Sequence, residues 1–287
     1  MSVAAKLYEL NMLELAKATG ASGLPPAAMR LLLSPLGPIA NVLAQRLAVF
    51  DASLQHQRLE VAARRVLLRF GAAPQITGHV PKKGPLLVIA NHPGTYDALS
   101  LFTAIGREDL RLIVGETAFL RALTNMQKHF LFVPYPKAGE NDSVMRAAGL
   151  RHAIQHLKKG GAILHFAAGA IEPDPAFLAP GQEPLRDWQQ GTAALVQAAA
   201  RYDAQLAVAA ISGVHSRRAK RLWLVRHAEK RGITTLATLF QVALPGFREV
   251  DLRVRFSTPA PAAAIGTLPP SELVDRLQRT ARELLGR

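Results

Sequence analysis

The chain has 287 residues, of which 49% are apolar and 20% charged, and it contains no cysteine. This composition excludes intrinsic disorder, and the lack of cysteine excludes a disulfide scaffold, thiolate metal sites and cysteine nucleophiles. Lys and Arg number 35 against 21 Asp and Glu, which gives a formal net charge of +14. An excess of this size predicts an anionic partner: nucleic acid, an anionic membrane surface, or an acidic or phosphorylated substrate.

Residues 1–70 are predicted to form a helical lead. Acidic and basic side chains interrupt residues 1–19, so no signal-peptide core is predicted there. The uncharged stretch 31–44 is shorter than the roughly 20 residues of a transmembrane helix, and prolines interrupt it, so no transmembrane helix is predicted. Because Arg30 and Arg46 flank this stretch, it either lies in a membrane interface or packs as a helix hairpin on the main domain.

Strands and helices are predicted to alternate after a helix that Asp51 caps, in which apolar residues recur every seven positions: Leu54, Val61 and Leu68. The predicted strands are 86–90, 110–114, 130–133, 162–166 and 206–211, with 222–226 as a further candidate. The predicted helices are 99–105, 118–129, 143–159, 191–201 and 271–285. This order indicates an α/β fold with a mainly parallel central sheet flanked by helices. The predicted organisation is the lead 1–70, an α/β domain 71–258, and a linker with a closing helix 259–287.

A segment with candidate catalytic residues follows the first buried strand: Asn91-His92-Pro93-Gly94-Thr95-Tyr96-Asp97. Open α/β sheets place their sites at the carboxyl ends of strands. A turn here brings Asp97 back to His92, where the carboxylate holds one ring nitrogen protonated and leaves the other free to accept a proton. The segment contains no Ser or Cys, so the pair is predicted to activate a hydroxyl or amine of the substrate. The alternative is a turn histidine beside a helix N-terminal aspartate.

This segment resembles the Asn-His-x4-Asp motif of the glycerol-phosphate and lysophosphatidate acyltransferase superfamily. Residues 160–169 occupy the place of that family's strand and Phe-Pro-Glu-Gly-Thr motif, and 206–213 resembles its last motif. The resemblance implies a membrane-associated α/β enzyme that moves an acyl chain from coenzyme A or acyl carrier protein to a glycerolipid hydroxyl, with no further cofactor. His92 is then the general base, Asp97 its orienting partner, and Gly169 a turn residue where the backbone approaches the acceptor.

Other positions depart from the family pattern. Apolar residues replace the family's Glu, Thr and Arg around Gly169, and the nearest acidic residues, Glu172 and Asp174, come later. Tyr135 stands where the family has an Arg for phosphate, and Lys137 is the nearest cation. A phosphate dianion needs forked or clustered cations, so acyl transfer is better supported than a glycerol-phosphate type of acceptor. By position, the resemblance assigns substrate binding to Tyr135, Lys137, Gly169 and Glu172, and an acceptor phosphate needs cations from elsewhere in the chain.

The densest basic run is Arg217-Arg218-Ala219-Lys220-Arg221. It is a solvated face, a dock for anionic lipid headgroups, or a dock for the phosphates of the acyl carrier; each cation near an anionic bilayer contributes about 1 kcal/mol. No nucleic-acid partner is predicted, because only Trp223 is available nearby to stack on bases. No metal site is predicted, because His152 and His156 have helical spacing without a nearby carboxylate.

These observations predict an acyltransferase that is cytoplasmic and peripheral on the inner face of the cell membrane. Two other functions remain open. One is a non-catalytic lipid- or membrane-binding relative of the same fold, which the diverged residues around Gly169 favour. The other is an acyl-thioester hydrolase, which releases thiol without a lipid acceptor. The intact pair of His92 and Asp97 favours the acyltransferase.

Overall fold

A computed structural model describes residues 1–133, 142–230 and 235–286. At its centre is a sheet with the strand order β1-β7-β6-β2-β5-β3-β4, in which β8 also pairs with β6. The strands are β1 (Gln75–Thr77), β2 (Leu86–Ala90), β3 (Leu110–Gly115), β4 (Phe130–Val133), β5 (Ala162–Phe166), β6 (Gln205–Ser212), β7 (Arg253–Phe256) and β8 (Ala260–Pro261). In the described residues only β6 forms antiparallel pairs, with β7 and β8, so the predicted mainly parallel sheet is confirmed.

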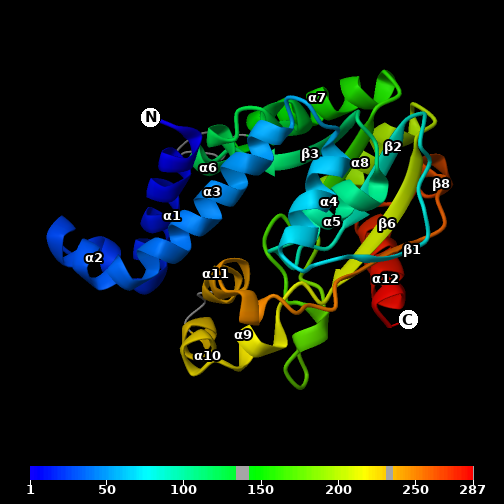
Figure 1. Ribbon diagram of the computed structural model, residues 1–287. Helices are drawn as coiled ribbons and strands as arrows, with labels where there is room; N and C mark the ends of the chain where they lie inside the picture. Colours follow the sequence, from blue (N-terminus) through cyan, green and yellow to red (C-terminus); the bar gives the residue numbers. More distant parts are fainter. Residues whose placement is uncertain (134–141, 231–234, 287) are drawn as a thin grey trace.

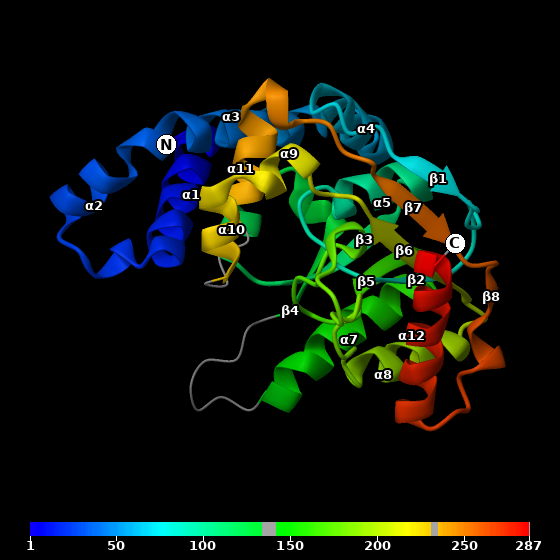
Figure 2. The same ribbon diagram turned by 90° about the horizontal axis from the view of Figure 1, so that it is seen from below.

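Helices cover both faces of the sheet (Figures 1 and 2). One face carries α4 (Leu59–Arg69) and α5 (Asp97–Ile105), and the other carries α7 (Asp142–Lys158), α8 (Gly191–Ala200) and α12 (Pro270–Gly286). Successive side chains of β2 point to opposite faces: Leu86 and Val88 enter the first core, and Leu87 and Ile89 enter the second. Burial on both faces explains why this strand reads as an uninterrupted apolar run.

The predicted helical lead consists of α1 (Val3–Thr19), α2 (Pro26–Leu33) and α3 (Gly37–Ser53). The lead extends to one side of the molecule, with α2 at the end away from the sheet (Figures 1 and 2). It shares a small apolar core with α10 (Trp223–Lys230) and α11 (Thr235–Ala243). The lead therefore packs on the rest of the chain through α1 and α3.

The helical run from α2 into α3 is longer than the sequence predicted. A 3₁₀ turn at Ser34–Leu36 joins the two helices through Pro35, and Pro38 sits in the first turn of α3, where its missing N–H removes no helical hydrogen bond. By length and composition alone, the run Ala27–Ser53 is long and apolar enough to cross a membrane. Of its most apolar 18-residue segment, 24% is buried inside the protein. We expected the prolines to interrupt the apolar stretch, but the helical run continues through them.

The expectations for α4 were wrong in two respects. Asp51 caps no helix start; it lies buried inside α3, and its carboxylate accepts hydrogen bonds from the backbone N–H groups of Asn125 and Met126. Val61 and Leu68 are exposed. The buried face follows the helical repeat instead; its residues are Leu59, Ala62, Ala63, Val66 and Leu67.

Three further assignments differ from the prediction. The helix expected over 118–129 ends early as α6 (Ala118–Ala122), and a 3₁₀ turn follows at Met126–His129. The candidate strand 222–226 is helical apart from Leu222, which separates α9 (Arg217–Arg221) from α10; Trp223 is exposed and Val225 is buried. Neither β1 nor β7 was predicted. Strand β1 is only three residues long and all three are exposed, so it carries no hydrophobic pattern.

Candidate active site

Three loops meet at one edge of the sheet. Strand β2 lies between β5 and β6 and runs parallel to both, so the segments that follow these three strands leave from the same edge. Asn91, the first residue after β2, joins its segment to β6: its side-chain oxygen accepts from the Ile211 N–H at 2.7 Å, and its side-chain nitrogen donates to the Ile211 carbonyl at 2.9 Å. The loop that carries His92 is thereby fixed to the neighbouring strand.

His92 and Asp97 are in direct contact. His92 Nδ1 lies 2.6 Å from Asp97 Oδ2, and the same oxygen accepts from the Gly94 N–H at 2.7 Å. Gly94 has φ of +85°, a conformation open to glycine, and this turn brings the first residue of α5 back to His92. The His92 ring stacks on Phe166 with centroids 4.2 Å apart and is 28% exposed, whereas Asp97 is 3% exposed.

This geometry sets the proton positions on His92. A carboxylate only accepts hydrogen bonds, so Nδ1 carries a proton and Nε2 is the basic nitrogen. Burial by itself lowers the pKa of His92, but the Asp97 carboxylate, with Glu172 beyond it, outweighs burial and raises the pKa above its ordinary 6.5. The imidazole is therefore a stronger base than an isolated histidine, and its Nε2 makes no polar contact within the described parts of the chain.

Glu172 holds the backbone of His92. Its Oε2 accepts from the His92 N–H at 2.7 Å, and its Oε1 accepts from the Arg186 N–H at 3.0 Å and from Trp188 Nε1 at 3.2 Å. The residue is 3% exposed, and burial raises the pKa of its carboxyl group although these donors oppose the rise. Both oxygens are occupied by protein donors, so this environment does not support the predicted substrate contact and makes Glu172 a positioning residue.

Of the other predicted binding residues, the structure describes only Gly169. Gly169 follows β5 at the same edge, is exposed, and has φ of +65°. A Cβ at this position would meet the end of the flexible Gln189 side chain, which would have to shift, and the positive φ itself favours glycine. Tyr135 and Lys137 lie outside the described residues.

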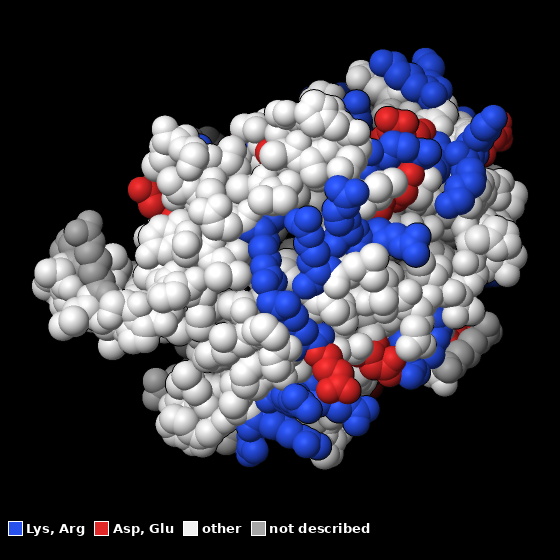
Figure 3. All heavy atoms as spheres, in the orientation of Figure 1, with Lys and Arg blue, Asp and Glu red and all other residues white. Residues whose placement is uncertain are grey.

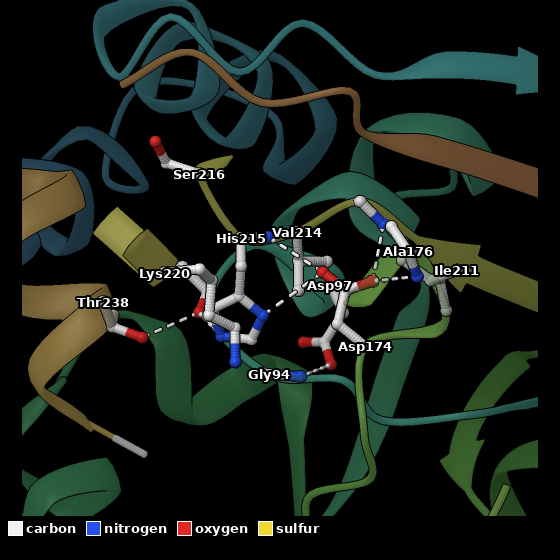
Figure 4. A network of polar contacts seen from close by, with 12 residues as sticks. Gly94, Asp97, Asp174, Ala176, Ile211, Val214, His215, Ser216, Lys220 and Thr238 are labelled. Atoms are coloured by element: carbon white, nitrogen blue, oxygen red, sulfur yellow. Dashed lines mark hydrogen bonds and ion pairs between the residues drawn. The ribbon is translucent and has the colours of Figure 1, made fainter. Parts of the chain in front are cut away.

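A second carboxylate–imidazole pair adjoins the first (Figure 4). Asp174 Oδ2 lies 3.2 Å from His215 Nδ1 and accepts from the His215 N–H at 3.0 Å, while Oδ1 accepts from the N–H groups of Gly213 and Ala176. Burial would raise the pKa of Asp174, but His215 and these donors outweigh burial and hold the pKa below its ordinary value. His215 Nε2 in turn lies 3.4 Å from Thr95 Oγ1. The second pair therefore reaches the loop that contains the first.

Thr95 connects the two pairs. It lies between His92 and Asp97 in the sequence, and its hydroxyl is 2.8 Å from that of Thr238 in α11. Its φ is +53°, which is rare for a β-branched residue and costs on the order of 1–3 kcal/mol. Backbone strain of this kind persists only when the surroundings hold it, and here the hydroxyl contacts hold it.

Sequence reasoning missed His215 and its partner. The available signal was that His215 follows the end of β6 by three residues, much as His92 follows the end of β2. Only the adjacency of β2 and β6 makes the two positions equivalent. Within the described residues, no group of three or more His, Asp or Glu side chains is placed to hold a metal ion.

The basic run 217–221 forms the short helix α9. Arg217, Arg218 and Arg221 are exposed, whereas Lys220 is partly buried and pairs with Glu229 at 2.6 Å. Lys220 is thus partly neutralised, and the exposed charge of this run comes from its arginines.

Comparisons with known proteins give one family match and a structural likeness. No curated protein matches the chain. Among solved structures it is similar to the 1-acyl-sn-glycerophosphate acyltransferase PlsC from Thermotoga maritima, with a TM-score of 0.45 and 14% identity over 90% of this chain and 93% of that one. Residues 74–212 match the family described as Acyltransferase. This family match over residues 74–212 confirms the resemblance predicted from the sequence.

Proposed function

We propose that the protein transfers an acyl chain from a thioester of coenzyme A or acyl carrier protein to a hydroxyl of a glycerolipid or related lipid. The observation that carries the proposal is the 2.6 Å contact between His92 Nδ1 and Asp97 at the sheet edge where three loops meet. The family match supplies the reaction class. The thioester is a co-substrate, and the proposal includes no other cofactor.

In this mechanism His92 acts as a general base and then as a general acid. Nε2 takes the proton of the acceptor hydroxyl while the acceptor oxygen attacks the thioester carbon. When the tetrahedral intermediate collapses, the carbon–sulfur bond breaks and His92 returns the proton to the leaving sulfur. Asp97 keeps the ring in the productive tautomer and stabilises the imidazolium that forms between the two steps.

The same proposal places the enzyme on the inner face of the cell membrane as a peripheral protein. Trp223 and Leu224 in α10 are 74% and 47% exposed, and Leu31 in α2 is 78% exposed. The exposed arginines of α9 lie next to Trp223 in the chain. Apolar side chains beside cations suit an anionic membrane interface, where the aromatic ring enters the headgroup region and the cations meet lipid phosphates.

The test of the proposed reaction is transfer by purified protein. An acyl thioester is mixed with a panel of lysophospholipids, glycerol 3-phosphate and amine acceptors, and both released thiol and acylated product are measured. His92→Ala is expected to lower transfer by about 10²–10⁴-fold, the contribution typical of a general base. His79→Ala is the matched control, because His79 is exposed and lies on the far side of β2 in the sequence.

Each outcome distinguishes one function from another. Transfer that survives His92→Ala while the fold is intact excludes His92 as the base. Thiol release that needs no acceptor identifies a thioester hydrolase. Binding of lipid without thiol release identifies a non-catalytic relative.

A further inference from the structure

Three arginines from distant parts of the chain gather beside the loop that carries the catalytic pair. Arg46 comes from α3, Arg69 ends α4, and Arg248 follows the 3₁₀ turn at Pro245–Phe247. Arg248 donates a hydrogen bond to the Arg69 carbonyl at 3.4 Å. Figure 3 shows basic side chains gathered in the middle of the face on which α3, α4 and α11 meet in Figure 1.

Among the described residues, this cluster of Arg46, Arg69 and Arg248 contains no ion pair. In the part of the chain that the structure describes, the ion pairs of arginine involve other residues, and none of the three arginines is paired with Asp or Glu. Burial lowers the pKa of Arg46, and the positive charges of Arg248 and Arg69 lower it further. Positive charges that repel one another in this way favour an anion among them.

Two polar atoms at this point are buried without a hydrogen-bond partner among the described residues: Arg248 Nε and Tyr96 Oη. Tyr96 is 1% exposed and stacks on Phe70, over which the Arg46 guanidinium lies at 5.0 Å. Burial raises the pKa of Tyr96 to about 12, so its hydroxyl remains a donor at neutral pH. A buried donor without an acceptor is costly, and a bound acceptor removes that cost.

The neighbouring side-chain amide of Gln241 interacts with the Tyr96 hydroxyl closely enough to oppose the rise in its pKa, but no hydrogen bond of ordinary length and angle joins the two groups. Gln241 already accepts from the Ser216 N–H at 2.7 Å and donates to the Val214 carbonyl at 2.7 Å. Its orientation is therefore fixed by the backbone around it. The hydroxyl of Tyr96 and the guanidinium of Arg248 are left with unused donor capacity beside the unpaired charge.

We propose that Arg46, Arg69 and Arg248 bind a phosphate group at this point, with the Tyr96 hydroxyl as a further donor. Guanidinium groups present forked donors that match phosphate oxygens, and three of them neutralise a dianion. The site has contacts distinct from those of His92, which stacks on Phe166 rather than Phe70. The experiment below measures phosphate binding directly, so its result does not depend on whether the protein transfers acyl chains.

The experiment follows the unfolding midpoint of the purified full-length protein as inorganic phosphate is added at constant ionic strength, with chloride as the reference. An anion that binds only the folded state raises this midpoint in a saturable way. Arg69→Gln is the main variant, because Arg69 is exposed and its loss spares the core. Tyr96→Phe removes only the hydroxyl. Arg279→Gln, an exposed arginine of α12, is the matched control for the loss of one charge.

Wild type and Arg279→Gln are expected to respond to phosphate alike. Arg69→Gln is expected to need about tenfold more phosphate for the half-maximal rise, and Tyr96→Phe several-fold more, as the loss of one donor to an anion implies. Arg248→Gln, if it folds, is expected to show the largest loss. A wild-type midpoint that responds equally to phosphate and chloride overturns the site, as does an Arg69→Gln response equal to that of wild type.

Parallel titrations identify which molecule carries the bound phosphate. Glycerol 3-phosphate and coenzyme A replace inorganic phosphate in the titration, and vesicles of phosphatidylglycerol are compared with vesicles of phosphatidylcholine. A response specific to one of these that is lost in Arg69→Gln supports the site and assigns it to the acceptor, the donor or the bilayer. No Arg69-dependent response to any of them counts against the site.

Discussion

His92 and Glu172 are joined by two hydrogen bonds: the His92 N–H donates to the Glu172 side-chain carboxylate at 2.7 Å, and the Glu172 N–H donates to the His92 carbonyl at 2.7 Å. These bonds connect the segment after β2 with the segment after β5. Asp97 fixes the ring of His92, and Glu172 fixes its main chain. The acidic residue displaced from the family pattern thus has a defined task beside the proposed base.

Replacing Glu172 tests this task. Glu172→Ala leaves one buried and two partly buried donors without their acceptor, and we expect the free energy of unfolding to fall by about 2–4 kcal/mol. Glu172→Gln keeps one acceptor oxygen and is expected to lose less. Urea denaturation measures both. Glu183→Ala is the control, because the side chain of Glu183 is 74% exposed and should change stability by less than about 0.5 kcal/mol. Equal losses in Glu172→Ala and Glu183→Ala would contradict the positioning role.

The raised pKa of His92 predicts the pH dependence of transfer. A general base works in its neutral form, so kcat/KM should fall as pH falls through the raised pKa, with the acid limb centred above 6.5. In Asp97→Asn the charge that raises the pKa is gone, so the limb should move to lower pH while the rate at high pH also falls. An acid limb centred below 6.5 in wild type, or one unmoved in Asp97→Asn, would falsify this assignment.

Asp174 is predicted to stabilise the fold in a pH-dependent way. Its pKa is depressed in the folded state, so its contribution is present above the unfolded pKa of about 3.9 and is lost as pH falls through the folded value. Asp174→Asn weakens the acceptor of several backbone N–H groups, so it should cost about 1–3 kcal/mol near pH 7. The difference from wild type should shrink below about pH 4. The exposed Asp275→Asn is the control, and a difference that persists at low pH would exclude this account.

Two glycines with positive φ offer a matched pair. Gly169→Ala and Gly160→Ala each introduce a left-handed alanine, at a cost of about 1–2 kcal/mol. At Gly160 nothing lies within 4 Å of the new Cβ, whereas at Gly169 it meets Gln189. We expect Gly169→Ala to cost more, and the excess to disappear in a Gln189→Ala background. Equal costs for the two single variants would show that Gln189 moves aside freely.

Membrane docking predicts a role for the exposed face of α10. Trp223→Ala should weaken sedimentation with phosphatidylglycerol vesicles by about tenfold, which corresponds to the burial of part of one large apolar side chain. Leu68→Ala is the control, because Leu68 is 55% exposed on α4 but lies away from α10. Added salt should weaken the binding of wild type and of Trp223→Ala, because it screens the attraction between the arginines of α9 and the lipid phosphates. Unchanged binding of Trp223→Ala would locate the membrane contact elsewhere.

The sequence by itself determined the core strands and one catalytic candidate pair. Strand β2 is buried on both faces, so its five residues are all apolar, and the local composition is enough to predict its position. The pairing of His92 with Asp97 is equally local, because a single turn through Gly94 closes it. Patterns of this kind depend only on neighbours in the chain. They fail where an element is short and exposed, as in β1, or where an acidic residue serves a distant segment, as Asp51 does.

Only the tertiary structure decided which distant groups meet at the site. Asp174 and His215 lie 41 positions apart, and Arg46 and Arg248 come from opposite ends of the chain. Their proximity depends on β2 lying between β5 and β6 and on α3 packing against α11. The physical reason is that helical and strand periodicities record which face of an element is buried, but not which other element covers it. The basic excess of the sequence predicted an anionic partner, and the fold brought three of its unpaired arginines to one place.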